Sequence, residues 1–331
     1  MPGRAFRGSP CLPRGVLLTD AMTSSARGRS KHAPVQVSEE LFAPVNAGIE
    51  LCYQTFGNPE DEPLVLVMGL GGPMIWWDPD LCELLARAGF YVVRFDNRDI
   101  GRSSKAPGRV TRATLLRAFA GGRVRAPYTL DDMAADTLGL MDHLGFESAH
   151  LVGVSMGGMI AQTMTIAQPG RVRSLTCIMS TTGKRTVGWQ HPSLLPTLLT
   201  PRNSRDDYIA GSAQVWKIIS SPAYPLDQVK GRERAADTYD RGVPRAGVLR
   251  QMMAILKQPN RSVRLRSLRV PTLVIHGLAD KMVHVSGGRA TAAAIPGAEL
   301  LLIDGMGHDL PPALFETYVA AIRRVADRAA Q

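Results

Sequence analysis

Residues 150–164 read HLVGVSMGGMIAQTM, and this stretch decides the fold. An apolar run, HLVGV, leads into a cluster of glycines around Ser155, and a run of small and apolar residues leads out of it. The first run is typical of a strand buried on both faces, and the second is typical of a buried helix. We therefore predict a strand over 150–154, a helix over 156–167 and a sharp turn between them that presents Ser155.

The glycines beside Ser155 make such a turn possible. Gly153 and Gly157 stand two residues before and two after the serine, where side chains would collide. The Gly-x-Ser-x-Gly pattern alone is weak, because chance supplies it in roughly one such glycine-rich chain in six. The position of the pattern between a strand and a helix favours a serine nucleophile over an incidental serine. The serine would lie at the N-terminus of the helix, where the helix dipole favours developing negative charge.

Strands and helices alternate through the rest of the chain. The run PLVLVM at 63–68 is continuously apolar, as expected for a central parallel strand. This alternation predicts an α/β fold with a mostly parallel sheet flanked by helices. We predict further strands at 41–47, 49–56, 91–95, 175–179, 272–276 and 300–303, and further helices at 77–88, 131–144 and 314–326.

Two stretches interrupt the alternation. Residues 98–128 are predicted to be a long polar loop. Residues 182–268 contain helical patterns without a buried-strand signal, and a connection of that length is too long for an ordinary loop. We predict a helical cap insertion over about 182–268, within a domain that spans residues 35–331. The helical patterns lie near 205–219, 226–239 and 244–256.

Residues 1–34 are predicted to form a disordered basic tail. Residues 1–33 are rich in Gly, Pro and Ser, and their six basic residues against Asp20 alone supply half of the net charge of +10. The apolar run at 15–18 is too short for a secretory signal. A transit peptide remains open, as does translation that starts at Met22.

Composition and charge exclude several classes of protein. The longest apolar runs, 63–70 and 300–303, fall far short of the roughly 18 residues of a membrane span, so no integral membrane segment is expected. No binding motif or aromatic-basic stripe points to nucleic acid. The densest basic run of the body is predicted to be a solvated face rather than an anion site. It consists of Arg261, Arg264, Arg266 and Arg269.

The cysteines give no sign of pairing or of metal binding. Cys11, Cys52, Cys82 and Cys177 have no CxxC spacing and no histidine cluster nearby, so neither a zinc site nor a disulfide framework is indicated. A reduced, cytoplasmic location is the simplest interpretation. The sequence leaves the oligomeric state open.

A serine nucleophile needs a base, and the base needs an acid to orient it. His308 follows the last predicted strand in a glycine-rich loop, at the sheet edge expected for Ser155. Asp280 follows the strand before it, at the same edge. Asp304 and Asp309 are the rival acids, but Asp280 completes the chain order Ser, Asp, His that α/β sheets use for such a triad.

Two backbone amides are predicted to bind the oxyanion that forms when a carbonyl is attacked. Met156 directly follows Ser155, so its N–H is the first donor. The second is the N–H of Leu70 in the loop GLGG at 69–72. That loop lacks both the GxGxxG spacing and a following Lys-Ser/Thr, so it is not a phosphate loop.

From about residue 40 onward the chain resembles the α/β-hydrolase superfamily, and within it the branch that includes aclacinomycin methylesterase. The resemblance implies a triad of Ser155, Asp280 and His308, with the helical insert as the cap that shapes the acyl pocket. One departure is Met68-Gly69, where many relatives carry His-Gly. The motifs that carry the resemblance are 95–103 (FDNRDIGRS), 128–133 (YTLDDM), 152–158 (VGVSMGG) and 307–311 (GHDLP).

These residues predict a serine hydrolase that cleaves small-molecule carboxylic esters without a metal or organic cofactor. A thioesterase, a C–C hydrolase and a cofactor-free perhydrolase remain open on the same triad, as does a non-catalytic ligand-binding protein. A haloalkane dehalogenase or epoxide hydrolase would carry Asp in place of Ser155. Candidate pocket residues, with packing inside the cap as the alternative for each, are Trp76, Trp77, Leu194, Leu195, Trp216, Ile218, Met252 and Met253.

Overall fold

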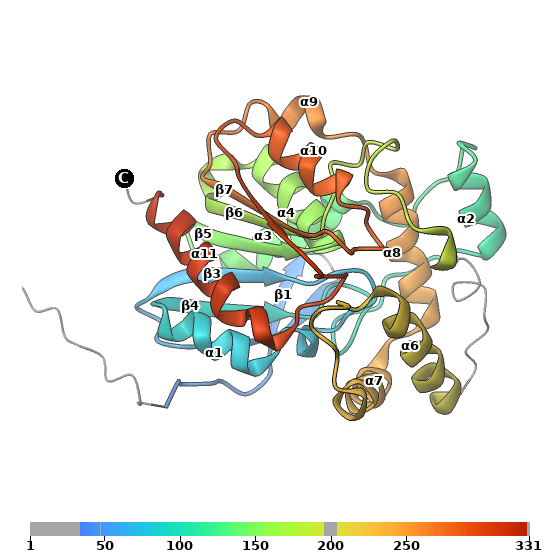
Figure 1. Ribbon diagram of the computed structural model, residues 1–331, viewed down its shortest axis with the longest axis horizontal. Coiled ribbons are helices and arrows are strands. Elements are labelled where there is room, and N and C mark those ends of the chain that lie inside the picture. Colours follow the sequence, from blue (N-terminus) through green and yellow to red (C-terminus); the bar gives the residue numbers. More distant parts are fainter. Residues whose placement is uncertain (1–33, 47, 195–203, 330–331) are drawn as a thin grey trace, which may run out of the picture. The chain divides into compact units, whose positions relative to one another are not determined.

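The computed structural model describes residues 34–46, 48–194 and 204–329, so the predicted tail lies almost wholly outside it. The described chain forms an eight-stranded sheet in the order β1-β2-β4-β3-β5-β6-β7-β8 (Figure 1). β2 pairs antiparallel with β1 and β4, and the other neighbouring strands are parallel. The predicted α/β fold with a mostly parallel sheet is confirmed. The strands are β1 Leu41–Asn46, β2 Ile49–Phe56, β3 Glu62–Val67, β4 Phe90–Phe95, β5 Ala149–Val154, β6 Val172–Ile178, β7 Thr272–Gly277 and β8 Glu299–Ile303.

The central strand β3 shows why its sequence is apolar throughout. Val65 and Val67 pack with α3 and α4 on one face of the sheet, and Leu64 and Leu66 pack with α1 and α11 on the other. Successive side chains of a strand alternate between faces, so a strand covered on both faces needs apolar residues at every position. The flanking helices are α1 Pro79–Arg87, α3 Leu130–His143, α4 Met156–Ala167, α10 Ser286–Ala294 and α11 Phe315–Asp327.

The connection from β6 to β7, residues 179–271, is called the insert below. Its described part contains helices at the three places where the sequence predicts them. That this insert acts as a cap remains a prediction. Its helices are α6 Arg205–Ile219, α7 Gln228–Gly242, α8 Arg245–Lys257 and the short α9 Ser262–Leu265. Short 3₁₀ helices occur here and elsewhere: η1 Met74–Trp76, η2 Pro169–Arg171, η3 Pro192–Leu194 and η4 Pro312–Leu314.

Two expectations from the sequence are wrong in part. The predicted loop 98–128 contains helix α2, Arg112–Phe119, whose first turn is closed by reciprocal hydrogen bonds between Thr111 and Thr114. Its apolar residues lie among arginines and glycines, which hides the helical pattern. The basic run is not wholly solvated either, because the side chain of Arg261 is buried.

Arg261 is buried because three neutral acceptors surround its guanidinium. Nε donates to Gln162 Oε1 (3.1 Å), Nη1 to Gln258 Oε1 (2.7 Å) and Nη2 to the carbonyl of Thr181 (3.0 Å). Burial lowers the pKa of Arg261 to about 10. The side chain therefore ties the end of the insert to α4, the helix that follows Ser155.

Among the described residues, no helix combines the length and the apolar character needed to cross a lipid bilayer.

Candidate active site

Ser155 occupies a strained turn between β5 and α4. Its backbone has φ +54° and ψ −117°, a conformation that residues other than glycine rarely adopt. A side chain on Gly153 would collide with the carbonyl of Gly157, and one on Gly157 would collide with the carbonyl of Val67. The glycines therefore let the chain turn sharply while the serine stays at the carboxyl edge of the sheet.

The structure brings Ser155, His308 and Asp280 together. His308 Nε2 lies 3.1 Å from Ser155 Oγ, and His308 Nδ1 lies 2.8 Å from Asp280 Oδ2. Because a carboxylate only accepts hydrogen bonds, Nδ1 carries the proton. Nε2 of the neutral ring is then the acceptor that faces the serine hydroxyl.

Asp280 is held in an orientation that its sequence position does not reveal. Oδ1 accepts the backbone N–H groups of Met282 (2.8 Å) and Val283 (2.9 Å), which leaves Oδ2 facing His308. Burial by itself raises the pKa of Asp280, but the imidazoles of His308 and His276 outweigh it, so the pKa lies below its ordinary value. Asp280 is therefore an ionised carboxylate around neutral pH.

His276 is a neighbour of this site that sequence reasoning missed. Its ring is fully buried, and Nε2 donates to the carbonyl of Val283 (2.8 Å) while lying 3.4 Å from Asp280 Oδ2. The sequence places His276 inside an apolar strand, and nothing there indicates that its ring reaches Asp280. Its contact adds a second imidazole to the surroundings of the carboxylate.

The two rival acids are occupied elsewhere. Asp309 accepts the backbone N–H of Ser221 (3.0 Å) and the hydroxyl of the same residue, and burial raises its pKa against the effect of those bonds. Asp304 is exposed and accepts the N–H of Gly305 (3.0 Å) within its own turn. Of the three candidate acids, Asp280 is the one that hydrogen-bonds the ring of His308.

The loop 69–72 runs directly beside Ser155. A Cβ added to Gly69 would lie 3.2 Å from the Cβ of Ser155, so the backbone of this loop lies against the serine. Met156 opens α4, where the first N–H groups have no acceptor within the helix. Within the described residues, the amides of Leu70 and Met156 donate to no protein acceptor. Both predicted donors are therefore free to bind an oxyanion.

Two buried amide side chains hold this loop in place. Asn97 Nδ2 donates to the carbonyl of Met68 (2.9 Å), and Gln251 Oε1 accepts the N–H of Gly71 (2.9 Å). Gln251 Nε2 also donates to the carbonyl of Arg98 (3.0 Å). Gln251 comes from α8, so a helix of the insert fixes the loop that carries the Leu70 amide.

The insert also supports the loop of His308. The N–H of His308 donates to the carbonyl of Ile219 at the end of α6 (2.7 Å), and the N–H of Gly307 donates to Ser221 Oγ (2.8 Å).

Two arginines of the insert with buried side chains form ion pairs near β4. Arg241 of α7 pairs with Asp96 and Glu40, and Arg250 of α8 makes two bonds to Asp99, 2.8 Å and 2.6 Å.

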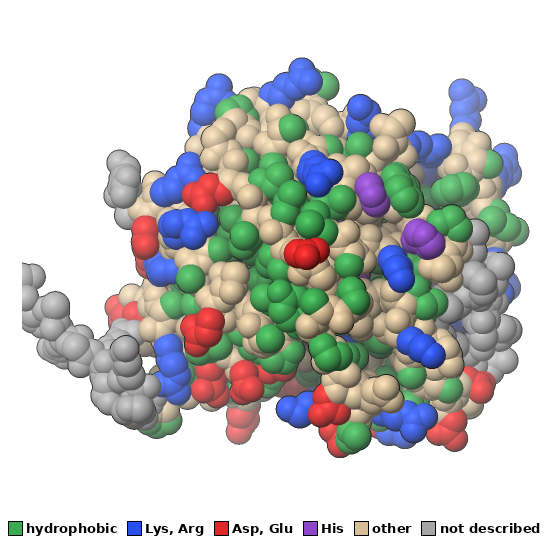
Figure 2. Space-filling view, viewed as in Figure 1, with side chains coloured by type: hydrophobic (Ala, Val, Ile, Leu, Met, Phe, Trp, Pro, Cys, Tyr) green, Lys and Arg blue, Asp and Glu red, His purple; other side chains and the backbone are tan. Residues whose placement is uncertain are grey.

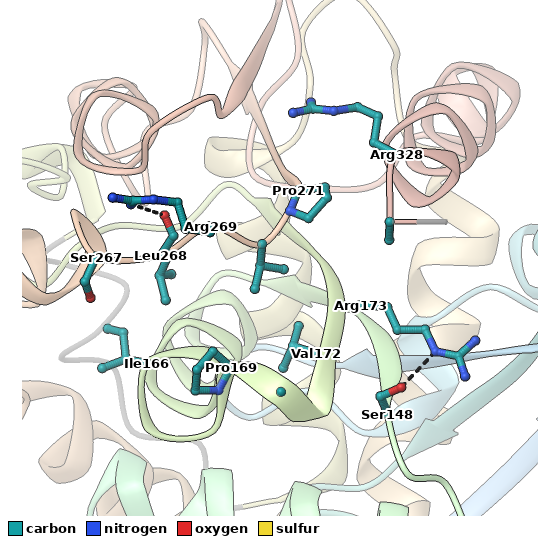
Figure 3. A pocket seen from close by; sticks show the side chains of 13 residues that line it. Ser148, Ile166, Pro169, Val172, Arg173, Ser267, Leu268, Arg269, Pro271 and Arg328 are labelled. Atoms are coloured by element: carbon teal, nitrogen blue, oxygen red, sulfur yellow. Dashed lines mark hydrogen bonds between the residues drawn. The ribbon is translucent and has the colours of Figure 1, made fainter. Parts of the chain in front are cut away.

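Two hollows of the described surface lie away from Ser155. The larger, about 630 Å³, is at the opposite, amino edge of the sheet, between residues 148, 169–173 and 267–271 (Figure 3). There Arg173 Nε donates to Ser148 Oγ (2.9 Å), and both side chains are exposed or partly exposed. A second hollow of about 430 Å³ lies beside Tyr128.

The predicted pocket residues divide into core and insert residues. Trp77 belongs to the core beneath the sheet, and Met253 to a buried cluster between α2 and α8, so packing explains both. Trp76 contacts Trp216 edge to face at 5.4 Å, and Arg234 lies over the ring of Trp216. Leu194 is buried, whereas Ile218 and Met252 are partly exposed. Leu195 lies outside the described residues.

No three His, Cys, Asp or Glu side chains within the described ranges are grouped so that they could hold a metal ion. The groups that lie together at this site are a hydroxyl, an imidazole and a carboxylate.

A strained serine at a strand-to-helix turn, with an imidazole and a carboxylate behind it, defines a hydrolase of the α/β type. Residues 62–311 match the model of the alpha/beta hydrolase fold family, and the chain belongs to that family. It is 26% identical over 303 residues to the rhodomycin D methylesterase DnrP of Streptomyces peucetius, covering 84% of this chain and 95% of that protein.

Solved structures share this fold. An enol-lactonase from Burkholderia xenovorans LB400 superposes with a TM-score of 0.67 at 24% identity, covering 88% of this chain and 100% of that one. The esterase RhEst1 from Rhodococcus sp. ECU1013 superposes with a TM-score of 0.66 at 21% identity, covering 87% and 98%. At these identities the likeness shows the fold. It agrees with the resemblance to hydrolases derived from the sequence motifs.

Proposed function

We propose that this protein is a serine carboxylic-ester hydrolase that cleaves small-molecule esters through an acyl-enzyme intermediate. The observation that carries the proposal is the continuous hydrogen-bonded row from Asp280 through His308 to Ser155. The methylesterase name of a relative that matches 84% of this chain supports the ester as the bond that is cleaved.

The first half of the reaction forms the acyl-enzyme. His308 Nε2 takes the proton of the Ser155 hydroxyl as Oγ bonds to the ester carbonyl carbon. The carbonyl oxygen becomes an oxyanion that accepts the N–H groups of Leu70 and Met156. The imidazolium then gives its proton to the leaving alcohol oxygen as the bond between acyl carbon and alcohol oxygen breaks.

The second half releases the acid. His308 Nε2 takes a proton from water as the water oxygen bonds to the acyl carbon, and the same proton returns to Ser155 Oγ as the acyl–enzyme bond breaks. Asp280 stays ionised throughout and stabilises the imidazolium, as its lowered pKa favours. The reaction needs no metal and no organic cofactor.

The insert acts in this proposal as a cap over the acyl pocket. Its helices supply the bonds that hold the Leu70 loop and the His308 loop. We expect the paired rings of Trp76 and Trp216, which join the loop after β3 to α6, to contact the substrate. Substrate size should therefore depend on α6.

Replacement of Ser155 tests the proposal. The S155A variant should lose at least about 10³-fold in kcat/KM on short p-nitrophenyl esters, because no nucleophile remains. S148A, at the opposite edge of the sheet, is the matched control and should keep wild-type activity. Circular dichroism should show both variants folded. Unchanged turnover in folded S155A would contradict the proposal.

A panel of substrates separates the alternatives that use the same triad. Thioesters, a C–C substrate and a peracid assay should each give lower kcat/KM than carboxylic esters. A purified wild-type protein that binds esters without turning any over would instead be a ligand-binding protein. The name of the DnrP relative favours the ester assignment over these alternatives.

A further inference from the structure

The segment between β4 and α3 carries a concentrated positive charge that catalysis does not use. Residues 105–126 contain Lys105 and five arginines, and no Asp or Glu. Among the ion pairs of the described residues, none involves these arginines. The five arginines, all exposed, are Arg109, Arg112, Arg117, Arg123 and Arg125.

Two large apolar side chains stand among these arginines. Leu116 is 69% exposed and Phe119 is 72% exposed, and their spacing of three residues places them on one face of α2. The adjacent face of α2 is packed against the protein, because Leu115 and Ala118 are buried with Met253 of α8. The outward apolar face is therefore not needed to hold α2 on the protein.

We call Leu116, Phe119, Arg112, Arg117, Arg123 and Arg125 the α2 surface. In Figure 2, the place where Figure 1 shows α2 has basic side chains next to hydrophobic ones. Arg185 extends the positive charge, because its Nη1 donates to the carbonyl of Phe119 (3.4 Å). The α2 surface thus combines an apolar pair with a surrounding set of cations.

We propose that the α2 surface docks this protein onto an anionic lipid bilayer. Leu116 and Phe119 enter the boundary between headgroups and acyl chains, and the arginines bind the lipid phosphates. A second copy of this chain is disfavoured as the partner, since like charges would oppose each other. Nucleic acid would use the arginines but would gain little from the exposed leucine and phenylalanine.

The proposal goes beyond ester hydrolysis and does not depend on it. A chain of contacts links the α2 surface to the site: α2 packs on α8, and α8 carries Gln251, which bonds the loop next to Ser155. Docking at α2 would therefore hold one side of the insert at the bilayer surface.

Sedimentation of the full-length chain with vesicles tests the docking. Wild type should bind vesicles of phosphatidylglycerol mixed with phosphatidylcholine, and bind phosphatidylcholine alone much less. The R112Q/R117Q variant should lose about 25-fold in partition coefficient, at about fivefold for each arginine. L116S/F119S should lose about tenfold. The control V229S, at a valine of α7 that is 66% exposed, should bind like wild type.

Fluorescence distinguishes insertion from simple attraction of charge. The F119W variant should gain a signal that vesicles with brominated acyl chains quench, whereas V229W should not. Wild type supplies the background of the four native tryptophans. All variants keep residues 1–33, so any contribution of those basic residues is the same throughout.

Two results would each overturn the proposal: vesicle binding that is unchanged in both double variants, or a fluorescence of F119W that brominated vesicles do not quench. A third is a combination: R112Q/R117Q weakens binding to duplex DNA, and L116S/F119S still binds vesicles like wild type. The last result would assign the arginines to nucleic acid. Hydrolysis of a soluble ester by L116S/F119S should equal that of wild type, which separates loss of docking from loss of the active site.

Discussion

The two edges of the sheet carry the same kinds of polar residues but differ in how far these residues are buried. At the carboxyl edge, arginines, glutamines and aspartates are buried and hydrogen-bonded, as Arg250 is to Asp99 and Gln251 is to the backbone N–H of Gly71. At the amino edge, Arg173 and Arg328 are exposed around an open hollow. Burying a polar group costs free energy unless the group is hydrogen-bonded. The buried polar side chains at the carboxyl edge therefore mark the place where the positions of the loops have to be fixed.

The sharpest difference between acids at the carboxyl edge is that between Asp280 and Asp309. D280N should keep the fold but lower kcat by about 10⁴-fold, because an amide in that position no longer selects the proper tautomer of His308. D309N should change kcat far less and lower the melting temperature instead, since Asp309 bonds Ser221. Equal losses of kcat in the two variants would contradict the assignment of Asp280.

Arginines of the two edges should differ in their contribution to stability. R250M leaves Asp99 buried without its cation, so we expect a loss of about 3–5 kcal/mol in the free energy of unfolding by urea. R173M removes an exposed side chain and should cost less than about 0.5 kcal/mol. Similar losses for the two variants would show that the buried anchors of the insert are unimportant.

A histidine near the amino edge should limit stability in acid. Burial lowers the pKa of His150 to about 4 from an ordinary 6.5. Below about pH 6.5 the unfolded chain binds a proton there that the folded chain refuses until about pH 4, so stability falls across that window by up to about 3 kcal/mol. H150N should flatten the pH dependence of the unfolding free energy, and a pH dependence unchanged from wild type would contradict this assignment.

The smallest effect tests whether the insert positions the oxyanion loop. Q251M leaves the N–H of Gly71 without its acceptor, and we expect kcat to fall about tenfold with KM little changed, less than for outright removal of a donor. Q162M removes an equally buried glutamine that bonds Arg261 instead. It should lower stability but leave kcat intact, and a comparable loss of kcat there would argue against a positioning role for Gln251.

Most of the sheet could be predicted from the sequence because buried parallel strands leave a simple signature. The run at 63–68 is apolar at every position since both faces are covered, and the glycines around Ser155 mark a turn that other residues cannot make. Ser155, Asp280 and His308 come after the parallel strands β5, β7 and β8, which places them at one edge of the sheet.

The residues that support this site left no such pattern. Gln251 is one polar residue in an otherwise amphipathic helix, and His276 is one histidine inside an apolar strand. The hydrogen bonds of the Gln251 amide and of the His276 ring depend on which chain segments pack against them. That packing belongs to the tertiary structure and leaves no local sequence pattern. Helix α2 escaped prediction for a related reason, because its outward leucine and phenylalanine obscure the division into apolar and polar faces.

The most direct test of the central claim is reaction of the full-length protein with a fluorophosphonate, followed by mass spectrometry and an ester assay on the same sample. We predict one modification, on Ser155, that removes hydrolysis in proportion to labelling and is strongly slowed in H308A. Labelling at another residue, or full labelling of Ser155 with hydrolysis undiminished, would contradict the account.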